Sequence, residues 1–417
     1  MPQSNGSPFT TGFRDGTISG VDMGTLFIER DYLIETYPSI DSRLKSTVLS
    51  IQGRNGQQGN IGQDNVTVAT YSSPVQTVAT GSFWTQVTMN QYRTGGVKVD
   101  GTLWMWGRGI CGELGDNNTL QKSSPVQTVS TGTNWKQVSA GCPVGAVKTD
   151  GTLWMWGRNH VGQLGNNDTL NRSSPVQTVS TGTNWRQVSV GSNIVGAVKC
   201  DGTLWMWGCG FQGIFGDNNS FGRFSSPVQT VATGTNWCLV SVGMNTGSGT
   251  SNQAGGIKTD GTLWLWGLGL YGLGNNDTFS RSSPVQTVAT GTNWKKFAAG
   301  KYMGMGLKTD GTLWLWGSGA GGMLGSNGTV HRSSPVQTVA TGTNWRSIPS
   351  NLAGGGGYIN AAIKTDGTLW TWGGTCVGSA NLSSPVQFAG SSRDWKSIEV
   401  GNDIVMQVGI RDVGGIL

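Results

Sequence analysis

The side chains that most often catalyse reactions or bind metals are few in this chain and follow no ligand spacing. The 417 residues include six cysteines and only two histidines, His160 and His331. No two cysteines form a CxxC pair, and neither histidine has a Cys, Asp or Glu at the spacing of a zinc ligand. We therefore predict free thiols, no metal site and no cofactor.

Catalytic motifs are equally absent from the sequence. No Ser/His/Asp order, paired-carboxylate motif or phosphate loop stands apart from the rest of the chain. The stretch from Gly107 to Gly112 resembles a dinucleotide-binding GxGxxG, but it lies between two predicted strands and opens no helix. We predict that the protein is not an enzyme.

Two recurring polar patterns allow more than one interpretation. The loops GDNNTL, GNNDTL, GDNNSF and GNNDTF carry oxygen ligands for calcium, yet they lack a DxDxDG ladder, and Asn, Asp and Gly also suit tight turns. We favour turns. Lysines recur two residues before an Asp-Gly pair and would form either a cationic ring or local contacts with carboxylates and solvent. We favour local contacts. These are Lys98, Lys148, Lys199, Lys258, Lys308 and Lys364.

The composition excludes several classes of protein. The formal net charge is +6, only 12% of the residues are charged, and no basic run resembles a nucleic-acid arm. No stretch approaches the roughly 18 apolar residues of a membrane span, and residues 1–16 do not resemble a secretion signal. We expect no nucleic-acid partner and no membrane insertion.

A period near 50 residues organises most of the chain and must position any site. The string DGTLW recurs at Asp100, Asp150, Asp201, Asp260, Asp310 and Asp366. SSPVQ occurs seven times, and a Trp follows each copy about eleven residues later. Those seven, with two from each of the six LWxW strings, account for all 19 tryptophans. This period is typical of propeller blades, and we predict that the tryptophans form the core.

Each period predicts four short strands. They are of the types WKQVSAG (strand A), GAVKT (B), TLWMWG (C) and SSPVQTV (D), and the Asp-Gly between B and C is a strong hairpin signal. In strand C, Leu103 and Met105 face one way and Trp104 and Trp106 the other. Both faces are apolar and must be covered, which favours blades stacked in a ring over a two-layer sandwich.

The two ends of the repeat region predict how the ring closes. Residues 46 to 73 contain a degenerate strand C and a strand D, while Trp395–Val400 and Ile404–Arg411 fit strands A and B. We therefore predict an all-β, seven-bladed β-propeller over residues 46–417, in which six complete blades and one blade closed by pairing N- and C-terminal strands avoid free edges.

The pattern W..V..G....A.K.DG.LW.WG.N..GQLG......SP.Q, as in GRNHVGQLG at Gly157 to Gly165, resembles the repeat of the regulator of chromosome condensation family. The resemblance covers about residues 46 to 417 and implies a seven-bladed propeller. Propellers of this type serve as nucleotide exchange factors, secreted inhibitors of β-lactamase and adhesive virion proteins, so the fold alone does not fix the function. A chromatin-bound exchange factor would carry basic segments and a wedge insertion, and this chain shows neither.

The repeats are more similar still to propeller proteins of tailed bacteriophages such as marine cyanophages. Those proteins pair a leader like VDMGTLFIERDYLIETYP, here Val21 to Pro38, with near-identical copies of LKTDGTLWLWG and SSPVQTVATGTNW. The resemblance implies a virion component that assembles in the host cytoplasm. Near-identical repeats rich in Ser, Thr, Asn and Gln agree with that expectation.

Residues 1–45 are predicted to form an attachment segment rather than a blade. Their charge is −2, and they carry a dense apolar run that a lone segment of this length cannot bury well. We expect this segment to bind other virion structural proteins, so that deletion of residues 1 to 40 leaves a folded propeller that no longer enters particles. The apolar residues are Leu26, Phe27, Ile28, Tyr32, Leu33 and Ile34.

The copies differ mainly in the A-to-B and C-to-D loops, which emerge together on one face. The Asp-Gly turns of the other face are nearly invariant. We therefore predict that the variable face recognises a partner, either a host surface protein or a glycan. Its candidate residues are Tyr92, Ile110, His160, Ile194, Phe211, Tyr271, Tyr302 and Tyr358.

These observations predict a non-enzymatic structural component of a phage particle, on the tail, a tail fibre or the capsid exterior. The alternatives are a soluble propeller that inhibits or regulates a protein partner, and a lectin-like module. Repeated identical sugar sites are disfavoured because Phe211, Tyr271, Tyr302 and Tyr358 do not share one register. A single composite glycan site stays open.

Overall fold

The protein is described here by a computed structural model. It describes residues 84–401, apart from 91, 130–131, 180–181, 232–233, 244–252, 290, 341, 353–358, 375–380 and 389–392, together with the backbone strands at 13–14, 17–18, 46–55, 69–76 and 407–413. The chain divides into two compact units, Met1–Ser46 with Val413–Leu417, and Thr47–Asp412. In the first, β1 (Phe13–Arg14) pairs antiparallel with β2 (Thr17–Ile18). The attachment residues Leu26 to Ile34 lie outside the described residues.

The second unit is built from four-stranded antiparallel sheets. We call each sheet of four consecutive strands a blade and number the blades along the chain from Trp84. Blade 2 shows why the repeat folds in this way. Its strands are β9 (Trp135–Ala140), β10 (Val144–Lys148), β11 (Leu153–Gly157) and β12 (Arg172–Gln177), paired in chain order. Asp150 and Gly151 form the hairpin between β10 and β11, and Gly151 adopts a φ of +77°. A side chain at Gly151 would collide with the carbonyl of Thr183, so the turn requires glycine.

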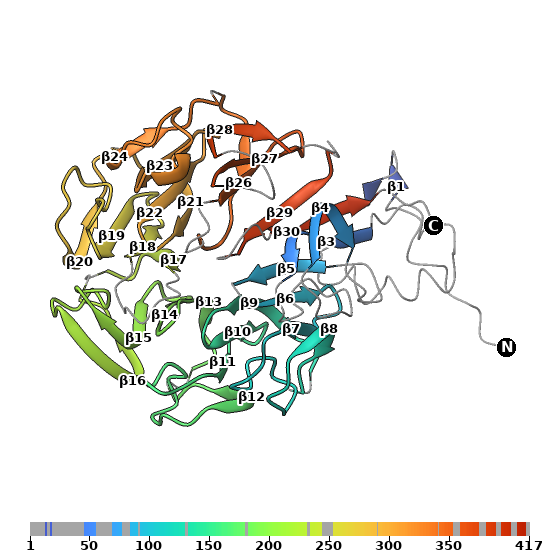
Figure 1. Ribbon diagram of the computed structural model, residues 1–417. Helices are drawn as coiled ribbons and strands as arrows, with labels where there is room; N and C mark the ends of the chain where they lie inside the picture. The colour runs from blue at the N-terminus through green and yellow to red at the C-terminus, as the bar shows by residue number, and fades with distance from the viewer. Residues whose placement is uncertain are drawn as a thin grey trace. The chain divides into compact units, whose positions relative to one another are not determined.

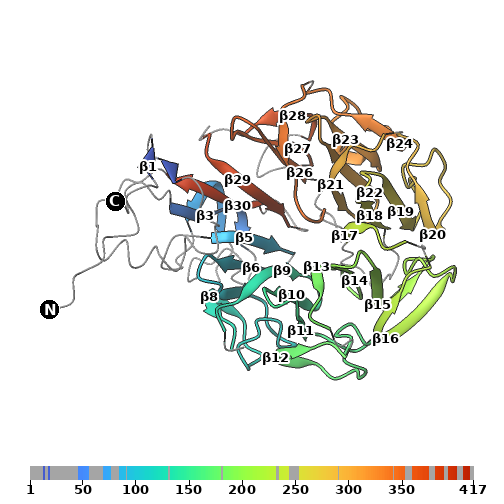
Figure 2. The same ribbon diagram turned by 180° about the vertical axis from the view of Figure 1, so that it is seen from behind.

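Five more blades repeat this order around the ring (Figures 1 and 2). Blade 1 contains β5 (Trp84–Met89), β6 (Arg93–Lys98), β7 (Leu103–Gly107) and β8 (Lys122–Gln127), and blade 3 contains β13 (Trp185–Val190), β14 (Ile194–Lys199), β15 (Leu204–Phe211) and β16 (Phe221–Gln229). Blade 4 contains β17 (Trp237–Val242), β18 (Gln253–Lys258), β19 (Leu263–Gly267) and β20 (Arg281–Gln286). Blade 5 contains β21 (Trp294–Ala299), β22 (Met303–Lys308), β23 (Leu313–Gly317) and β24 (Arg332–Gln337), and blade 6 contains β25 (Trp345–Ser347), β26 (Ile359–Lys364), β27 (Leu369–Gly373) and β28 (Leu382–Gln387).

The predicted count of seven blades is corrected to six complete blades of four consecutive strands. The remaining strands form one further sheet, which we call the joined sheet because it pairs the two ends of the repeat region. Its strands, in the order in which they pair, are β29 (Trp395–Val400), β30 (Gln407–Val413), β3 (Ser46–Asn55) and β4 (Ala69–Gln76). It is not a complete blade in the sense of the repeat, because β3 reads STVLSIQGRN where each blade has LWxWG and so lacks both core tryptophans. Its strand β29 contacts blade 6 on one side and β5 of blade 1 on the other.

Tryptophans fill the spaces between neighbouring blades, as the sequence predicts. Leu103 and Met105 of blade 1 belong to one buried cluster with Trp135 and Trp156 of blade 2. Trp156 is fully buried, and its indole nitrogen donates a hydrogen bond of 2.9 Å to the carbonyl of Glu113 in blade 1. Both faces of strand C are therefore covered by adjacent blades, and the indole N–H groups hold the blades in register.

The recurrent DGTLW string builds a hydrogen-bond relay. In blade 2, Thr152 donates from both its backbone nitrogen (2.9 Å) and its hydroxyl (2.7 Å) to Asp150 Oδ1, and Trp154 Nε1 donates to the Thr152 hydroxyl at 2.8 Å. The same three bonds occur at Asp100, Asp201, Asp260, Asp310 and Asp366.

The recurrent lysines pack on tryptophan rings. Lys148 Nζ lies 4.8 Å from the ring centroid of Trp135 and 4.6 Å from that of Trp154. All six lysines occupy the same position, between 3.9 and 5.2 Å from two rings. The local contact therefore includes a cation–π contact, which the sequence did not predict. The neighbouring hairpin carboxylates also act on these ammonium groups, as Asp366 does on Lys364.

Candidate functional site

The A-to-B and C-to-D loops meet on one face, as the sequence predicts. Tyr271 comes from the C-to-D loop of blade 4 and Tyr302 from the A-to-B loop of blade 5, and their ring centroids lie 5.4 Å apart. His331, at the end of the C-to-D loop of blade 5, lies 4.5 Å from Tyr271. Lys301 Nζ lies 4.6 Å from the centroid of Tyr302. We call Tyr271, Tyr302 and His331 the aromatic cluster.

The other predicted contact residues are spread around the ring. Tyr92 is half-buried under Arg108, whose guanidinium carbon lies 4.9 Å from its ring, while Ile110 and His160 are exposed. Phe211 is exposed and contacts Phe221 across the end of the β15–β16 hairpin, with centroids 4.7 Å apart. Tyr358 lies outside the described residues.

The prediction that Ile194 belongs to the binding face is wrong. Ile194 begins β14 and is 1% exposed. It packs in the same buried cluster as Ile214, because the loop is shorter than the sequence suggested and the strand already starts at this residue. Variation among the copies at this position reflects packing, so variability alone did not identify a surface residue.

Five exposed apolar residues of the C-to-D loops escaped the sequence analysis. Each lies five residues after the glycine that opens the polar turn, as in GDNNTL and GNNDTF. Three further exposed apolar residues lie in or at the ends of the same loops. We call all eight residues the apolar rim, and their side chains are between 42% and 68% exposed. Its members are Ile110, Leu120, Leu170, Phe211, Phe221, Leu270, Phe279 and Val330. The signal available in the sequence was an apolar residue at a fixed place in otherwise polar loops.

The polar turns hold the rim residues in place. Asp168 accepts a hydrogen bond from the backbone of Leu170 at 2.9 Å, which is the Asx-turn geometry expected from the sequence. The neighbouring Asn167 has a φ of +64°, and its N–H bonds the carbonyl of Ser225 in blade 3 at 2.8 Å. Equivalent bonds run from Asn117, Asn218, Asn276 and Asn327 to the next blade or sheet. These loops are turns locked onto their neighbours, so the rim is preorganised for contact.

The charges near the rim are largely neutralised. Asp168 pairs with Arg172 and Asp277 with Arg281, each within its own loop. Partial desolvation and the charges of Arg158 and Arg223 lower the pKa of His160, which favours the neutral form of this ring. The rim therefore combines apolar side chains with polar groups that already have partners, a chemistry suited to a protein surface.

Metal-binding groupings do not occur in the described part of the chain. No group of three or more His, Cys, Asp or Glu side chains within it could hold a metal ion. The cysteines it contains are free thiols, at Cys111, Cys142, Cys200, Cys209 and Cys238. Nor does any helix among the described residues have the length and apolar character needed to cross a bilayer.

The fold and the repeats together define an all-β propeller of the RCC1-like class. Residues 100–144 and 150–198 match the family model of the regulator of chromosome condensation (RCC1) repeat. These two segments therefore match the RCC1 repeat, and the family resemblance drawn from the sequence is supported for this part of the chain. A comparison with curated proteins found no match.

Solved structures support the same fold. Prp20p of Saccharomyces cerevisiae, described for its binding properties to Gsp1p and histones, matches with a TM-score of 0.73 and 15% identity over 88% of this chain and 92% of its own. Yeast RCC1 (Prp20) bound to Kap60 matches with a TM-score of 0.72 and 15% identity over 88% and 89%. Human WBSCR16 matches with a TM-score of 0.72 and 17% identity over 88% and 99%. At these identities the likeness concerns the fold alone.

The phage part of the resemblance receives no support from these comparisons. The matching family model and the three structures above are not described as virion proteins.

Proposed function

We propose that this chain is a non-enzymatic, protein-binding propeller that recognises its partner through the apolar rim. The observation that carries the proposal is the recurrence of one exposed apolar residue at the same place in five C-to-D loops, 54% to 68% exposed. Core packing cannot explain these residues, since they contact water, and the turns beneath them are fixed by hydrogen bonds to the next blade.

Support comes also from the relatives of the fold. Prp20p is described as binding Gsp1p and histones, and yeast RCC1 is described in complex with Kap60, so this propeller type presents surfaces to other proteins. In this chain the rim is apolar, and two carboxylates of its loops, Asp168 and Asp277, are paired with arginines. We expect the partner to offer a complementary apolar surface.

The test uses a matched pair of triple variants of the full chain. The rim variant carries Leu120→Glu, Leu170→Glu and Phe279→Glu. The control carries Val129→Glu, Val179→Glu and Val288→Glu, which lie at the other end of the same outer strands and are 44% to 45% exposed. Each variant is affinity-purified from the native cell, and cross-linked peptides are mapped by mass spectrometry.

We expect wild type and the control variant to retain a stoichiometric protein partner with cross-links beside the rim, and the rim variant to lose it. Cross-links confined to the Asp-Gly turns would contradict the proposal, as would a rim variant that binds like wild type. Circular dichroism on all three proteins separates loss of binding from loss of fold.

The aromatic cluster supports a second candidate, a single composite glycan site. Tyr271 and Tyr302 are half-buried and meet edge to face beside His331, an arrangement that offers one ring face for stacking on a sugar. A glycan array with wild type and Tyr271→Ala tests this role. Binding that depends on Tyr271 would support it, and an array without binding would reject it.

The virion role and the attachment role of residues 1–45 are retained as proposals, with other virion structural proteins as partners. Mass spectrometry of purified phage particles tests both. A fixed copy number of this chain, lost on deletion of residues 1 to 40, would support them, and absence from particles would favour the soluble protein-binding propeller.

A further inference from the structure

The inner strands of the ring carry a repeated inter-blade clamp that explains most of their polar residues. The third residue of the strand is Gln86, Gln137 or Gln187 in blades 1 to 3. Gln86 Nε2 donates to the carbonyl of Val138 at 2.8 Å, and its Oε1 accepts from the nitrogen of the same residue at 2.7 Å. Gln137 and Gln187 repeat both bonds toward blades 3 and 4.

A second clamp uses the fifth residue of the same strands. Ser139 Oγ accepts a hydrogen bond from the nitrogen of Val190 at 3.0 Å. Thr88, Ser189 and Ser241 accept equivalent bonds, so this clamp extends through blade 4. Polar residues at these two positions therefore assemble the ring in one half of the molecule.

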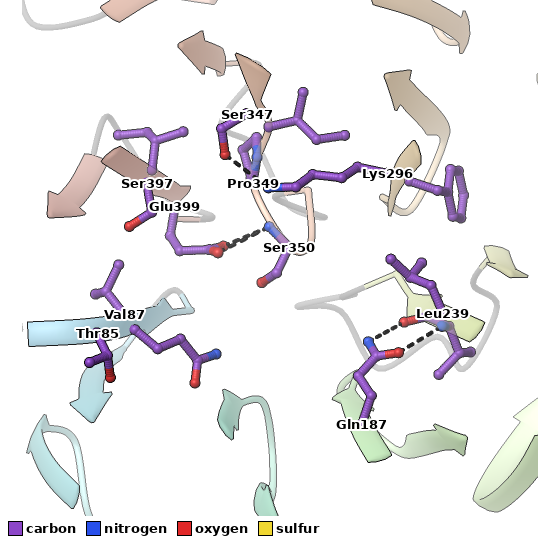
Figure 3. A pocket seen from close by; sticks show the side chains of 15 residues that line it. Thr85, Val87, Gln187, Leu239, Lys296, Ser347, Pro349, Ser350, Ser397 and Glu399 are labelled. Carbon is purple, nitrogen blue, oxygen red and sulfur yellow. Dashed lines mark hydrogen bonds between the residues drawn. The ribbon is translucent and has the colours of Figure 1, made fainter. Parts of the chain in front are cut away.

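Blades 5 and 6 and the joined sheet have other residues at these two positions. The third residue is Lys296 in blade 5, Ser347 in blade 6 and Ser397 in the joined sheet, and the fifth residue there is Glu399. These four side chains line a cavity of about 230 Å³ among the inner strands of six sheets, which places it at the centre of the ring (Figure 3). At the third position of the inner strand, an ammonium or hydroxyl group therefore stands where blades 1 to 3 have the glutamine amide, although the rest of the repeat is closely similar.

The segment after β25 lies across the ring beside this cavity. Ser350 donates its backbone N–H to the Glu399 carboxyl at 3.0 Å, and its carbonyl accepts from Ser241 Oγ of blade 4 at 3.0 Å. The side-chain oxygen of Asn351 accepts from Ser241 at 2.8 Å and from Ser189 of blade 3 at 3.2 Å. The wall formed by this segment is thus fixed to three other sheets.

The cavity offers hydrogen-bond donors that no protein group uses. Among the described residues, the Lys296 ammonium donates to Ser347 Oγ at 3.1 Å, which leaves two of its three donors, and the buried hydroxyl of Ser397 has no partner. Leu239, Phe297 and Ile398 supply apolar walls. Lys296 is half-buried. Unused donors around such a cation favour an acceptor with negative charge, and the apolar walls favour one attached to a carbon skeleton.

From this arrangement we infer that the central cavity binds a monoanionic organic carboxylate, anchored by Lys296 and Ser397. The carboxylate belongs either to a small molecule or to the C-terminus of a peptide. The site is independent of the apolar rim, so the two proposals can fail separately.

Glu399 sets the pH range of this binding. Desolvation raises its pKa to about 8 against the opposing effects of the Ser350 N–H and Lys296, so the carboxyl is neutral at pH 7 and can donate to an anion. Burial also lowers the pKa of Lys296, as do the charges of Lys295 and Arg346, while Glu399 raises it. When the pH rises through about 8, Glu399 becomes an anion beside the ligand, and affinity falls.

Isothermal titration calorimetry on the full chain tests the inference with four probes. These are butyrate, butyramide, an N-acetylated tripeptide with a free C-terminal carboxylate, and its C-terminal amide. We expect saturable binding of butyrate, of the free-acid peptide or of both, and about tenfold or more weaker binding of the matching amides. The two acids distinguish a small molecule from a chain terminus.

Three variants and one control, Lys295→Met, assign the binding to the cavity. Lys296→Met is expected to weaken binding of the acid about tenfold or more, while Lys295→Met, on the exposed side of the same strand, leaves it unchanged. Glu399→Gln keeps a donor and should flatten the loss of affinity between pH 7 and 9. Ser397→Ala, which removes one uncharged donor, should weaken binding without unfolding the ring.

The inference is overturned if neither acid binds, if amides bind as well as acids, or if Lys296→Met binds like wild type. Thermal unfolding of each variant shows that the ring is intact, and Ser397→Ala provides the second measurement if Lys296→Met does not fold.

Discussion

Among the described residues, a buried ion pair distinguishes blade 1 from the other blades. Arg93 Nη2 lies 2.8 Å from Glu113 Oε1, and the side chains are 2% and 4% exposed. Arg93 also donates to the carbonyl of Gly141 in blade 2. The same two positions hold Ile194 and Ile214 in blade 3, which pack together in one apolar cluster. The repeat therefore accepts either a charge pair or two apolar side chains, but both residues must change together.

This pairing predicts a non-additive effect on stability. Glu113→Ile alone leaves the Arg93 guanidinium buried without its carboxylate, and we expect it to lower the free energy of unfolding by about 3 to 5 kcal/mol. The double variant Arg93→Ile and Glu113→Ile copies blade 3 and should recover most of that loss. Urea unfolding of the three proteins measures both values, and a double variant less stable than Glu113→Ile would refute the argument.

At the scale of the element, the Asp-Thr-Trp relay explains why the hairpin is copied so closely. Asp150 fixes the turn, Thr152 links the carboxylate to the indole of Trp154, and Lys148 covers that indole. Replacing any one of these residues leaves a hydrogen-bonding or charged group of its neighbour without its partner. The constancy of this face thus follows from local chemistry and needs no partner.

The relay also predicts sensitivity to acid. Hydrogen bonds from Thr152 lower the pKa of Asp150 below its ordinary value, and the matching threonines do the same for Asp201, Asp260, Asp310 and Asp366. A group whose pKa is lower in the folded than in the unfolded state stabilises the fold at pH values above its unfolded-state pKa. This stabilisation is lost as the pH falls through its folded-state pKa.

We therefore expect the melting temperature to fall as the pH drops below about 4, with five turns losing their carboxylates over the same range. Thr152→Val, which removes the hydroxyl, should cost about 1 kcal/mol near pH 7 and make the acid-induced fall slightly shallower. Calorimetric scans from pH 7 to 3 measure both effects. A wild-type melting temperature independent of pH in this range would contradict the prediction.

For the molecule as a whole, the inner clamps make the ring unequal around its axis. Glutamine and Ser/Thr clamps connect blades 1 to 4, and the Ser241 clamp reaches Ala299 of blade 5. At the later positions Lys296, Pro349 and Glu399 take the places of clamping residues. The clamped half should resist opening more strongly, because each opening event there breaks two glutamine bonds and one Ser/Thr bond between blades, whereas blades 5 and 6 share the Lys296 bond to Ser347 at these positions.

Hydrogen exchange measures this difference. We expect the backbone amides of β9, β13 and β17 to exchange more slowly than those of β25 and β29. Gln137→Ala removes one clamp and should speed exchange in β13 while leaving β21 unchanged. Equal protection of all inner strands, or an effect of Gln137→Ala spread evenly around the ring, would argue against the clamps as the cause.

The amino-acid sequence determined the architecture because the period repeats short-range chemistry. Asp-Gly hairpins, LWxW strands and their spacing act within a few residues, and each copy restates them, so the order of strands in the six blades could be predicted. The expected number of seven blades was not reached, because β3 has no LWxW motif. The strands near the two ends of the chain therefore form a sheet without the core tryptophans of a complete blade.

Tertiary structure alone decided which side chains meet and which are exposed. It buried Ile194, brought Tyr271 against Tyr302 from separate blades, and left Leu170 and Phe279 in solvent. It also placed Lys296 and Glu399, more than 100 residues apart in the sequence, at one central cavity. Burial and contact depend on how closed the ring is and on what the next blade presents, and neither quantity is encoded in the local pattern of any one repeat.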